Sequence, residues 1–112
     1  MTSLHRFKAE FFKALAHPLR LAILDALREG EKSVSQLVQE LKVEQPTLSQ
    51  QLGLLRQKGL LEARREGNTV LYRTKDPGVY EFLDLGRRIF ERQLRENQAL
   101  LAALMEEPHG GN

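Results

Sequence analysis

Two short apolar helical patterns separated by only a few residues constrain the fold of this chain more than any other feature. The first follows Ser33, a good N-cap residue, and has apolar side chains at Val34, Leu37, Val38 and Leu41. The second begins near Pro46 and ends near Gly59, with apolar side chains at Leu48, Leu52 and Leu55. Two helices of this length joined by so short a turn predict a helix-turn-helix.

The period of the apolar residues changes after Gly59. In the segments 61–65 and 70–74, apolar and polar residues roughly alternate, and Gly67-Asn68 between them is typical of a tight turn. This pattern predicts a β-hairpin, or wing, over about 61–74. Isolated hairpins are marginal in water, so we expect the wing to pack on the helices or on a partner.

Helical patterns also flank this region. The first helix has apolar residues from Leu4 to Leu15, and the second runs from about Pro18 to Glu29, with Gly30 expected in a left-handed conformation at its end. Asp76 and Pro77 suit the N-cap and first turn of a last helix of roughly 28 residues, about 42 Å long. The predicted fold is mainly α with a small β-hairpin, a winged helix-turn-helix of four helices, two strands and a fifth helix.

The last helix is longer than a domain of this size, whose radius of gyration is near 13 Å. Its apolar stripe therefore needs a cover, and a second copy of the chain is the simplest one. We predict a dimer through segments 1–16 and 77–107, with interface residues Leu4, Phe7, Phe11, Phe82, Ile89, Phe90, Leu94 and Leu101. The alternative is a helix that breaks at Gly86 and folds back on itself.

Composition excludes several function classes. With 112 residues the chain has room for one domain, expected over 1–107 with a disordered tail at 108–112. There is no cysteine, which excludes disulfides, thiolate metal sites and thiol redox switching. No apolar run approaches the roughly 18 residues needed to cross a bilayer, and the start lacks the pattern of a signal peptide, so we expect a cytoplasmic protein.

Charge is distributed unevenly along the chain. Residues 42–75 carry a net charge of +4, whereas residues 76–112 carry −3. A basic middle beside an acidic end favours a polyanionic partner for the middle segment. We therefore predict that double-stranded DNA is bound by the helix at about 46–58 and by the wing, with contacts from Gln45, Thr47, Ser49, Gln50, Arg56, Arg64, Arg65 and Arg73.

Some residues of this region also have explanations that do not involve DNA. For Arg65 and Arg73 the alternative is a place on a solvated hairpin that contacts no DNA. Gly53, inside the predicted helix, would let a backbone approach DNA closely, but it could also be a tolerated substitution or a point of tight packing.

Three segments together resemble the ArsR/SmtB family of bacterial transcriptional repressors. They are 14–24 (ALAHPLRLAIL), 45–56 (QPTLSQQLGLLR) and 58–61 (KGLL), and the resemblance covers nearly the whole chain. It implies a dimeric winged helix that binds operator DNA, represses transcription and releases the DNA when an effector arrives.

The sensing sites of that family do not carry over. Where arsenic- and lead-type members have Cys-Val-Cys, this chain has Ser33-Val34-Ser35, and hydroxyls are poor substitutes for thiolate ligands. The positions that match the zinc ligands of the last helix are Asp76, Gly78, Ile89 and Arg92, of which Asp76 alone is retained. His5, His17 and His109 fit no ligand spacing. We expect no metal and no cofactor, and the nature of any small-molecule effector stays open.

A winged helix used as a protein-interaction module, with the last helix as its docking surface, is the alternative to a DNA-binding regulator. An enzyme is disfavoured because the sequence has no phosphate-binding loop, no recognisable carboxylate pair and no nucleophile beside a base.

Overall fold

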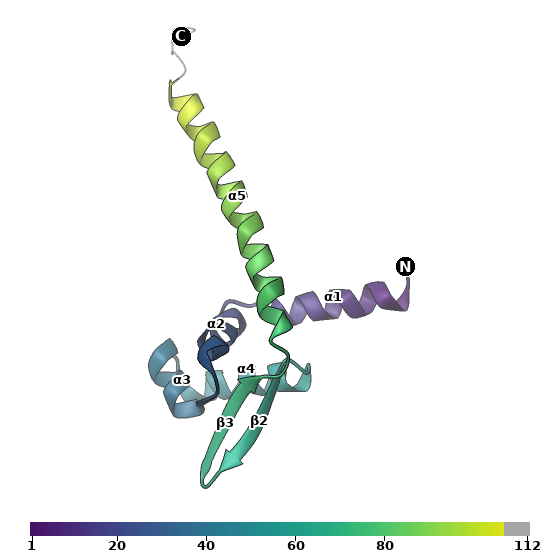
Figure 1. Ribbon diagram of the computed structural model, residues 1–112, viewed down its shortest axis with the longest axis vertical. Helices are drawn as coiled ribbons and strands as arrows, with labels where there is room; N and C mark the ends of the chain where they lie inside the picture. The colour runs from purple at the N-terminus through teal and green to yellow at the C-terminus, as the bar shows by residue number, and fades with distance from the viewer. Residues whose placement is uncertain (107–112) are drawn as a thin grey trace. The chain divides into compact units, whose positions relative to one another are not determined.

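The computed structural model describes residues 1–106 (Figure 1). Its elements are, in order, α1 (Ser3–Leu15), α2 (Pro18–Ala26), the 3₁₀ turn η1 (Leu27–Glu29), β1 (Lys32–Ser33), α3 (Val34–Leu41), α4 (Gln45–Gln57), β2 (Leu61–Glu66), β3 (Thr69–Thr74) and α5 (Gly78–Glu106). They form two compact units, Met1–Pro77 and a second that begins at Gly78. The predicted winged helix-turn-helix is confirmed, and the tail predicted at 108–112 lies outside the described residues.

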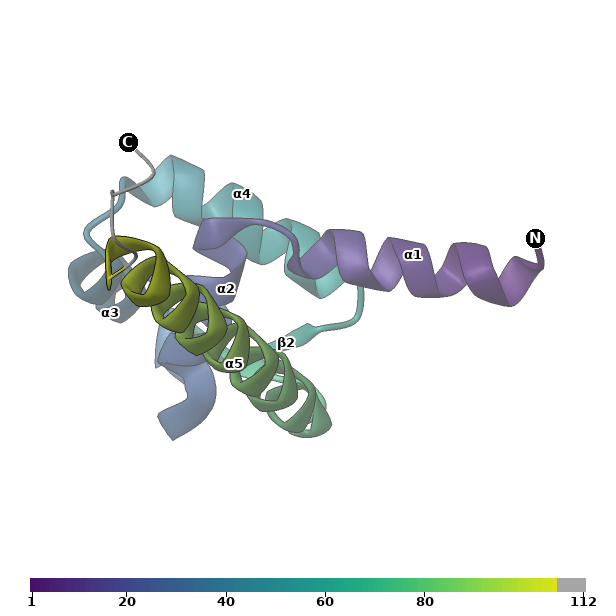
Figure 2. The ribbon, with the colours of Figure 1, turned by 90° about the horizontal axis from the view of Figure 1, so that it is seen from above.

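An apolar core holds the first unit together. Helices α2, α3 and α4 contact one another, and Figure 2 shows α2 close to both of the others. The fully buried side chains come from each of these helices and from β2: Ile23, Leu24, Leu37, Leu48, Leu52, Leu55 and Leu61. Each buried aliphatic side chain stabilises the fold by about 1.5–3 kcal/mol. The core therefore fixes α4 against α2 and α3.

Local signals set the ends of α3 and α4. The Ser33 hydroxyl accepts a hydrogen bond from the backbone N–H of Gln36 (3.2 Å), and the Gln36 side chain accepts one from the Ser33 N–H (2.8 Å). This capping box confirms Ser33 as the N-cap of α3. Helix α4 ends at Gln57, close to the predicted end near Gly59, and the φ of 78° at Gly59 permits a reversal in which the Leu60 N–H donates to the Leu55 carbonyl (2.9 Å).

The wing is a twisted part of a three-stranded antiparallel sheet with the order β1-β3-β2. Strand β2 pairs with β3 along its whole length, from Leu61 opposite Thr74 to Glu66 opposite Thr69. Gly67 has a φ of 61° at the first position of the two-residue turn, where only glycine is free of strain. The predicted hairpin is confirmed, and Figure 1 shows its tip extending away from α2, α3 and α4.

Strand β1 was not predicted. It has two residues, which is too short for any alternation to be recognised, and its Lys32 pairs with Tyr72 of β3. The second helix also differs from expectation, since α2 ends at Ala26 and continues as the tighter turn η1 to Glu29. Gly30 has the expected positive φ of 136°, but its ψ of −174° is extended and not left-handed helical.

The second unit contains α5, a single uninterrupted helix of 29 residues. It begins at Gly78, directly after Pro77, and is continuous through Gly86, so the alternative of a broken helix is wrong. At 1.5 Å per residue the helix is about 43 Å long. Arg87 and Glu91 form an i,i+4 ion pair (3.0 Å) on its polar side.

We predict that His17→Ala destabilises the chain because His17 is the N-cap of α2. Its Nδ1 accepts a hydrogen bond from the Leu19 N–H (3.2 Å), and loss of an N-cap costs about 0.5–2 kcal/mol. Urea denaturation monitored by circular dichroism measures the change. His17→Asn, which retains a capping acceptor, is the matched control; equal destabilisation by both variants would contradict a capping role.

Candidate nucleic-acid interface

Helix α4 has one buried face and one exposed face. Leu48, Leu52 and Leu55 are at most 1% exposed and point into the core. Because successive residues of a helix are about 100° apart, burial of these three directs Ser49, Gln50 and Gly53 outward. The helix thus presents short polar and amide side chains on a rigid support.

A buried polar contact connects α4 to two other helices. Gln51 is the one buried polar residue found among residues 1–106, and its Oε1 accepts a hydrogen bond from Arg20 Nε (2.8 Å). The Arg20 guanidinium also donates to the carbonyls of Lys13 (3.4 Å) and Ala14 (3.3 Å) at the end of α1. Burying an amide without a hydrogen bond costs free energy of folding, so this contact fixes the orientation of α4 about its own axis.

The five predicted DNA-contacting residues of α4 are all exposed: Gln45, Thr47, Ser49, Gln50 and Arg56. Gly53 lies in the same exposed surface, and a Cβ atom added there would meet no atom within 4 Å. Tight packing within the described chain therefore does not explain this glycine. All of these α4 residues are accessible to solvent, and their contacts with DNA stay a prediction.

The three predicted wing arginines differ in their surroundings. Arg64 makes ion pairs with Glu31 and Glu66, and Arg73 makes one with Glu62 (2.8 Å). The hydrogen bonds that Arg64 donates to Glu31 lower the pKa of the Glu31 carboxyl and raise the pKa of the Arg64 guanidinium. Arg65 is exposed and has no ion pair with any residue of the segment 1–106. The three residues look alike in the sequence, because Glu31 and Glu62 come near Arg64 and Arg73 only once the sheet has formed.

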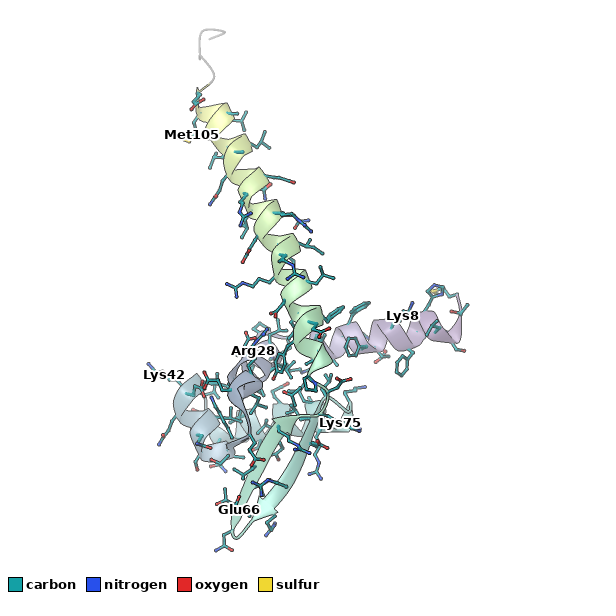
Figure 3. All side chains as sticks on the ribbon, in the orientation of Figure 1. Lys8, Arg28, Lys42, Glu66, Lys75 and Met105 are labelled. Carbon is teal, nitrogen blue, oxygen red and sulfur yellow. The ribbon has the colours of Figure 1, made fainter. Side chains whose placement is uncertain are left out.

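A further cation, Lys42, lies in the turn between α3 and α4 and was missing from the predicted set. It has φ 55° and ψ 47°, a left-handed conformation that is uncommon for a residue other than glycine or asparagine. Figure 3 shows its side chain directed away from the core. No residue type in this turn signals that conformation, because glycine or asparagine is its usual residue.

The predicted dimer residues lie on α1 and α5. On α1, Leu4 and Phe7 are 60% and 73% exposed, and Phe11 is half-buried. On α5, a large part of each predicted apolar side chain is exposed: Phe82, Ile89, Phe90, Leu94 and Leu101. So much exposed apolar surface is unusual for a single soluble chain.

Among residues 1–106, no three His, Asp or Glu side chains are grouped as they would be around a metal ion. His5 is instead part of the capping box of α1, where its Nδ1 lies 2.9 Å from the Thr2 hydroxyl. The same stretch of chain contains no helix with the length and apolar character of a membrane span.

Comparison with known proteins identifies the chain. The family model described as "Bacterial regulatory protein, arsR family" matches residues 17–63, which include α2, α3 and α4. The HTH-type transcriptional regulator Rv0081 of Mycobacterium tuberculosis is 43% identical over 102 residues, which cover 90% of each chain. The chain belongs to the ArsR family. Members of this family are transcription regulators, which are not a class of enzyme.

Solved structures of ArsR relatives have the same fold. The crystal structure of Rv0081 matches with a TM-score of 0.80 and 42% identity over 87% of this chain and 98% of that one. The solution structure of a homodimeric winged helix-turn-helix domain, Mb0332 of Mycobacterium bovis, matches with a TM-score of 0.73 and 35% identity, covering 82% of this chain and 85% of that one. The biofilm growth-associated repressor of Xylella fastidiosa is 40% identical over 88 residues, 79% of this chain and 77% of its own length.

We predict that Gly53→Ala stabilises the folded protein by up to about 1 kcal/mol, because alanine is the better helix former and its Cβ meets empty space here. Thermal or urea denaturation measures the change. Gly59→Ala is the control: that site is equally open, but its φ of 78° strains an alanine, so stability should fall. A loss of stability on Gly53→Ala would contradict the open position of this residue.

Proposed function

We propose that this chain is a homodimeric, sequence-specific DNA-binding repressor. Helix α4 enters the major groove, where Thr47, Ser49 and Gln50 reach base edges, and the wing holds the neighbouring phosphates. The observation that carries this proposal is the exposed polar face of α4, held on a buried leucine face. Amide and hydroxyl groups are those that hydrogen-bond to base edges, and Gly53 leaves room for the duplex to come close.

The charges of this unit fit a polyanion. Residues 42–75 have a net charge of +4, and Arg56, Lys42 and Arg65 are exposed around the polar face of α4 and on the wing. Basic side chains that neutralise phosphates supply affinity without sequence preference, while α4 supplies the preference.

The second copy of the chain covers the apolar sides of α1 and α5. Phe7 and Phe90 are 73% and 65% exposed, and large exposed apolar side chains on each of these helices are typical of an interface. The homodimeric relative Mb0332 has the same fold over 82% of this chain. Two α4 helices related by a twofold axis would meet half-sites about one turn of DNA apart.

The signal that releases the DNA is neither a thiol reaction nor a metal bound in the known family sites. The chain has no cysteine, and Ser33, at the position of a thiolate ligand in the resemblance, is occupied in capping α3. We expect any effector to bind by chemistry other than thiolate or metal coordination, and the protein to act in the cytoplasm. A small molecule in the apolar dimer interface is the simplest such effector.

The DNA-binding proposal is tested with duplexes selected from a random pool. Wild-type protein should bind a selected duplex with an affinity that falls steeply with salt, and Gln50→Ala should weaken that binding roughly tenfold or more while leaving binding to unselected DNA unchanged. Fluorescence anisotropy measures both. Gln98→Ala, which removes an exposed amide from α5, is the control and should bind like wild type. Salt-independent binding, or no selected sequence, would refute the proposal.

The dimer is tested by Phe90→Glu. A carboxylate in an apolar interface is unpaired and desolvated, so the variant should be monomeric at micromolar concentration and should bind DNA more weakly. Sedimentation velocity measures the change. Arg88→Glu, two residues earlier and about 200° around the helix, should remain dimeric. Monomeric wild-type protein under these conditions would contradict this interface.

A further inference from the structure

The two neighbouring arginines of β2 lie on opposite faces of the hairpin. Successive side chains of a strand alternate between faces, so Glu62, Arg64 and Glu66 share one face and Arg65 lies on the other. The strand register supports this arrangement, because Glu62 lies opposite Arg73 and Arg65 opposite Val70. The wing therefore presents its arginines to two different environments.

The face that contains Arg64 is a network of ion pairs. Arg64 Nε donates to both carboxylate oxygens of Glu31 (2.9 and 3.1 Å), and its Nη2 donates to Glu31 and to Glu66 (2.9 Å). Arg73 Nε donates to Glu62 (2.8 Å). Two arginines thus meet three glutamates, so the positive charges on this face are compensated by carboxylates of the chain itself.

The network also joins the wing to the helix-turn-helix. Glu31 immediately precedes β1, which pairs with β3 and leads directly into α3. When a planar guanidinium binds both oxygens of one carboxylate, the relative orientation of the two groups is fixed. A lysine in its place would not fix that orientation. Arg64 therefore fixes the angle of the hairpin relative to the start of α3.

Arg65 has none of these partners. It is exposed, it lies two residues before Gly67 at the tip, and neither an ion pair nor a side-chain hydrogen bond is found for it within the described part of the chain. Figure 3 shows the neighbouring Glu66 close to the tip of the hairpin. Arg65 is thus a cation with an uncompensated charge at the end of the wing.

We propose that Arg65 is the wing residue that binds a DNA phosphate and that Arg64 and Arg73 are positioning residues that hold the hairpin in place. This inference rests on the proposed DNA-binding function and divides the roles of three arginines that the sequence presents as equivalent. Transfer of Arg64 to a phosphate would break its bonds to Glu31 and leave that carboxylate beside the DNA.

The test compares Arg65→Gln with Arg64→Gln and Arg73→Gln, which each remove one positive charge from the same hairpin. Arg65→Gln should weaken binding to a fluorescent duplex of about 30 base pairs roughly tenfold and lower the salt slope by about 0.9 per lost phosphate contact, with Tm unchanged. Arg64→Gln and Arg73→Gln should keep the wild-type salt slope, and Arg64→Gln should lower Tm.

A double-mutant cycle tests the positioning role without DNA. Glu31→Gln should lower Tm as Arg64→Gln does, and the double variant should lose little more than either single variant. If Arg64→Gln does not fold, Arg64→Lys keeps the charge but loses the paired hydrogen bonds, and should lower Tm while keeping the salt slope.

The outcomes separate this inference from the proposed function. Equal losses of affinity and slope for Arg64→Gln and Arg65→Gln, or an unchanged slope for Arg65→Gln, would overturn the division of roles while leaving DNA binding intact. Wild-type protein that binds no duplex would overturn the proposed function and the role of Arg65 with it. Additive effects of Glu31→Gln and Arg64→Gln on Tm would overturn the positioning role of Arg64.

Discussion

The burial of one face of α4 is the constraint on which the rest of the structure depends. Leu48, Leu52 and Leu55 are closely packed against α2 and α3, and in a helix the directions of all other side chains follow from theirs. The polar face of α4 is therefore presented outward as a consequence of core packing and needs no support of its own. A helix held this way loses little conformational freedom when it meets a ligand, which favours selective binding.

Much of the fold could be predicted because its local signals agree with one another. Apolar periodicity located the helices, Ser33 and Gly59 marked two of their ends, and Gly67-Asn68 marked the turn of the hairpin. The exceptions have physical causes. Strand β1 is two residues long and exists only because β3 lies beside it, and η1 is a tightened continuation of α2 that has the same apolar pattern as an ordinary helical turn.

The candidate site was predicted less completely than the fold. Exposure of Ser49 and Gln50 follows from helical spacing, so the sequence located the polar face of α4. The pairing of Arg64 with Glu31 could not be predicted from helical spacing, because the two residues are 33 positions apart and meet only when the sheet forms. The left-handed conformation of Lys42 is a property of the tight turn, and residue type alone pointed away from it.

The hydrogen bonds of Arg20 link α1 to α4 within the first unit. One guanidinium holds both the carbonyl end of α1 and an amide inside α4, through bonds of 2.8 to 3.4 Å. Hydrogen bonds of this length tolerate little stretching. If α1 and α4 shifted independently, Arg20 would therefore lose its hydrogen bonds either to the α1 carbonyls or to Gln51. A displacement of α1 would therefore be transmitted to α4 through the single side chain of Arg20.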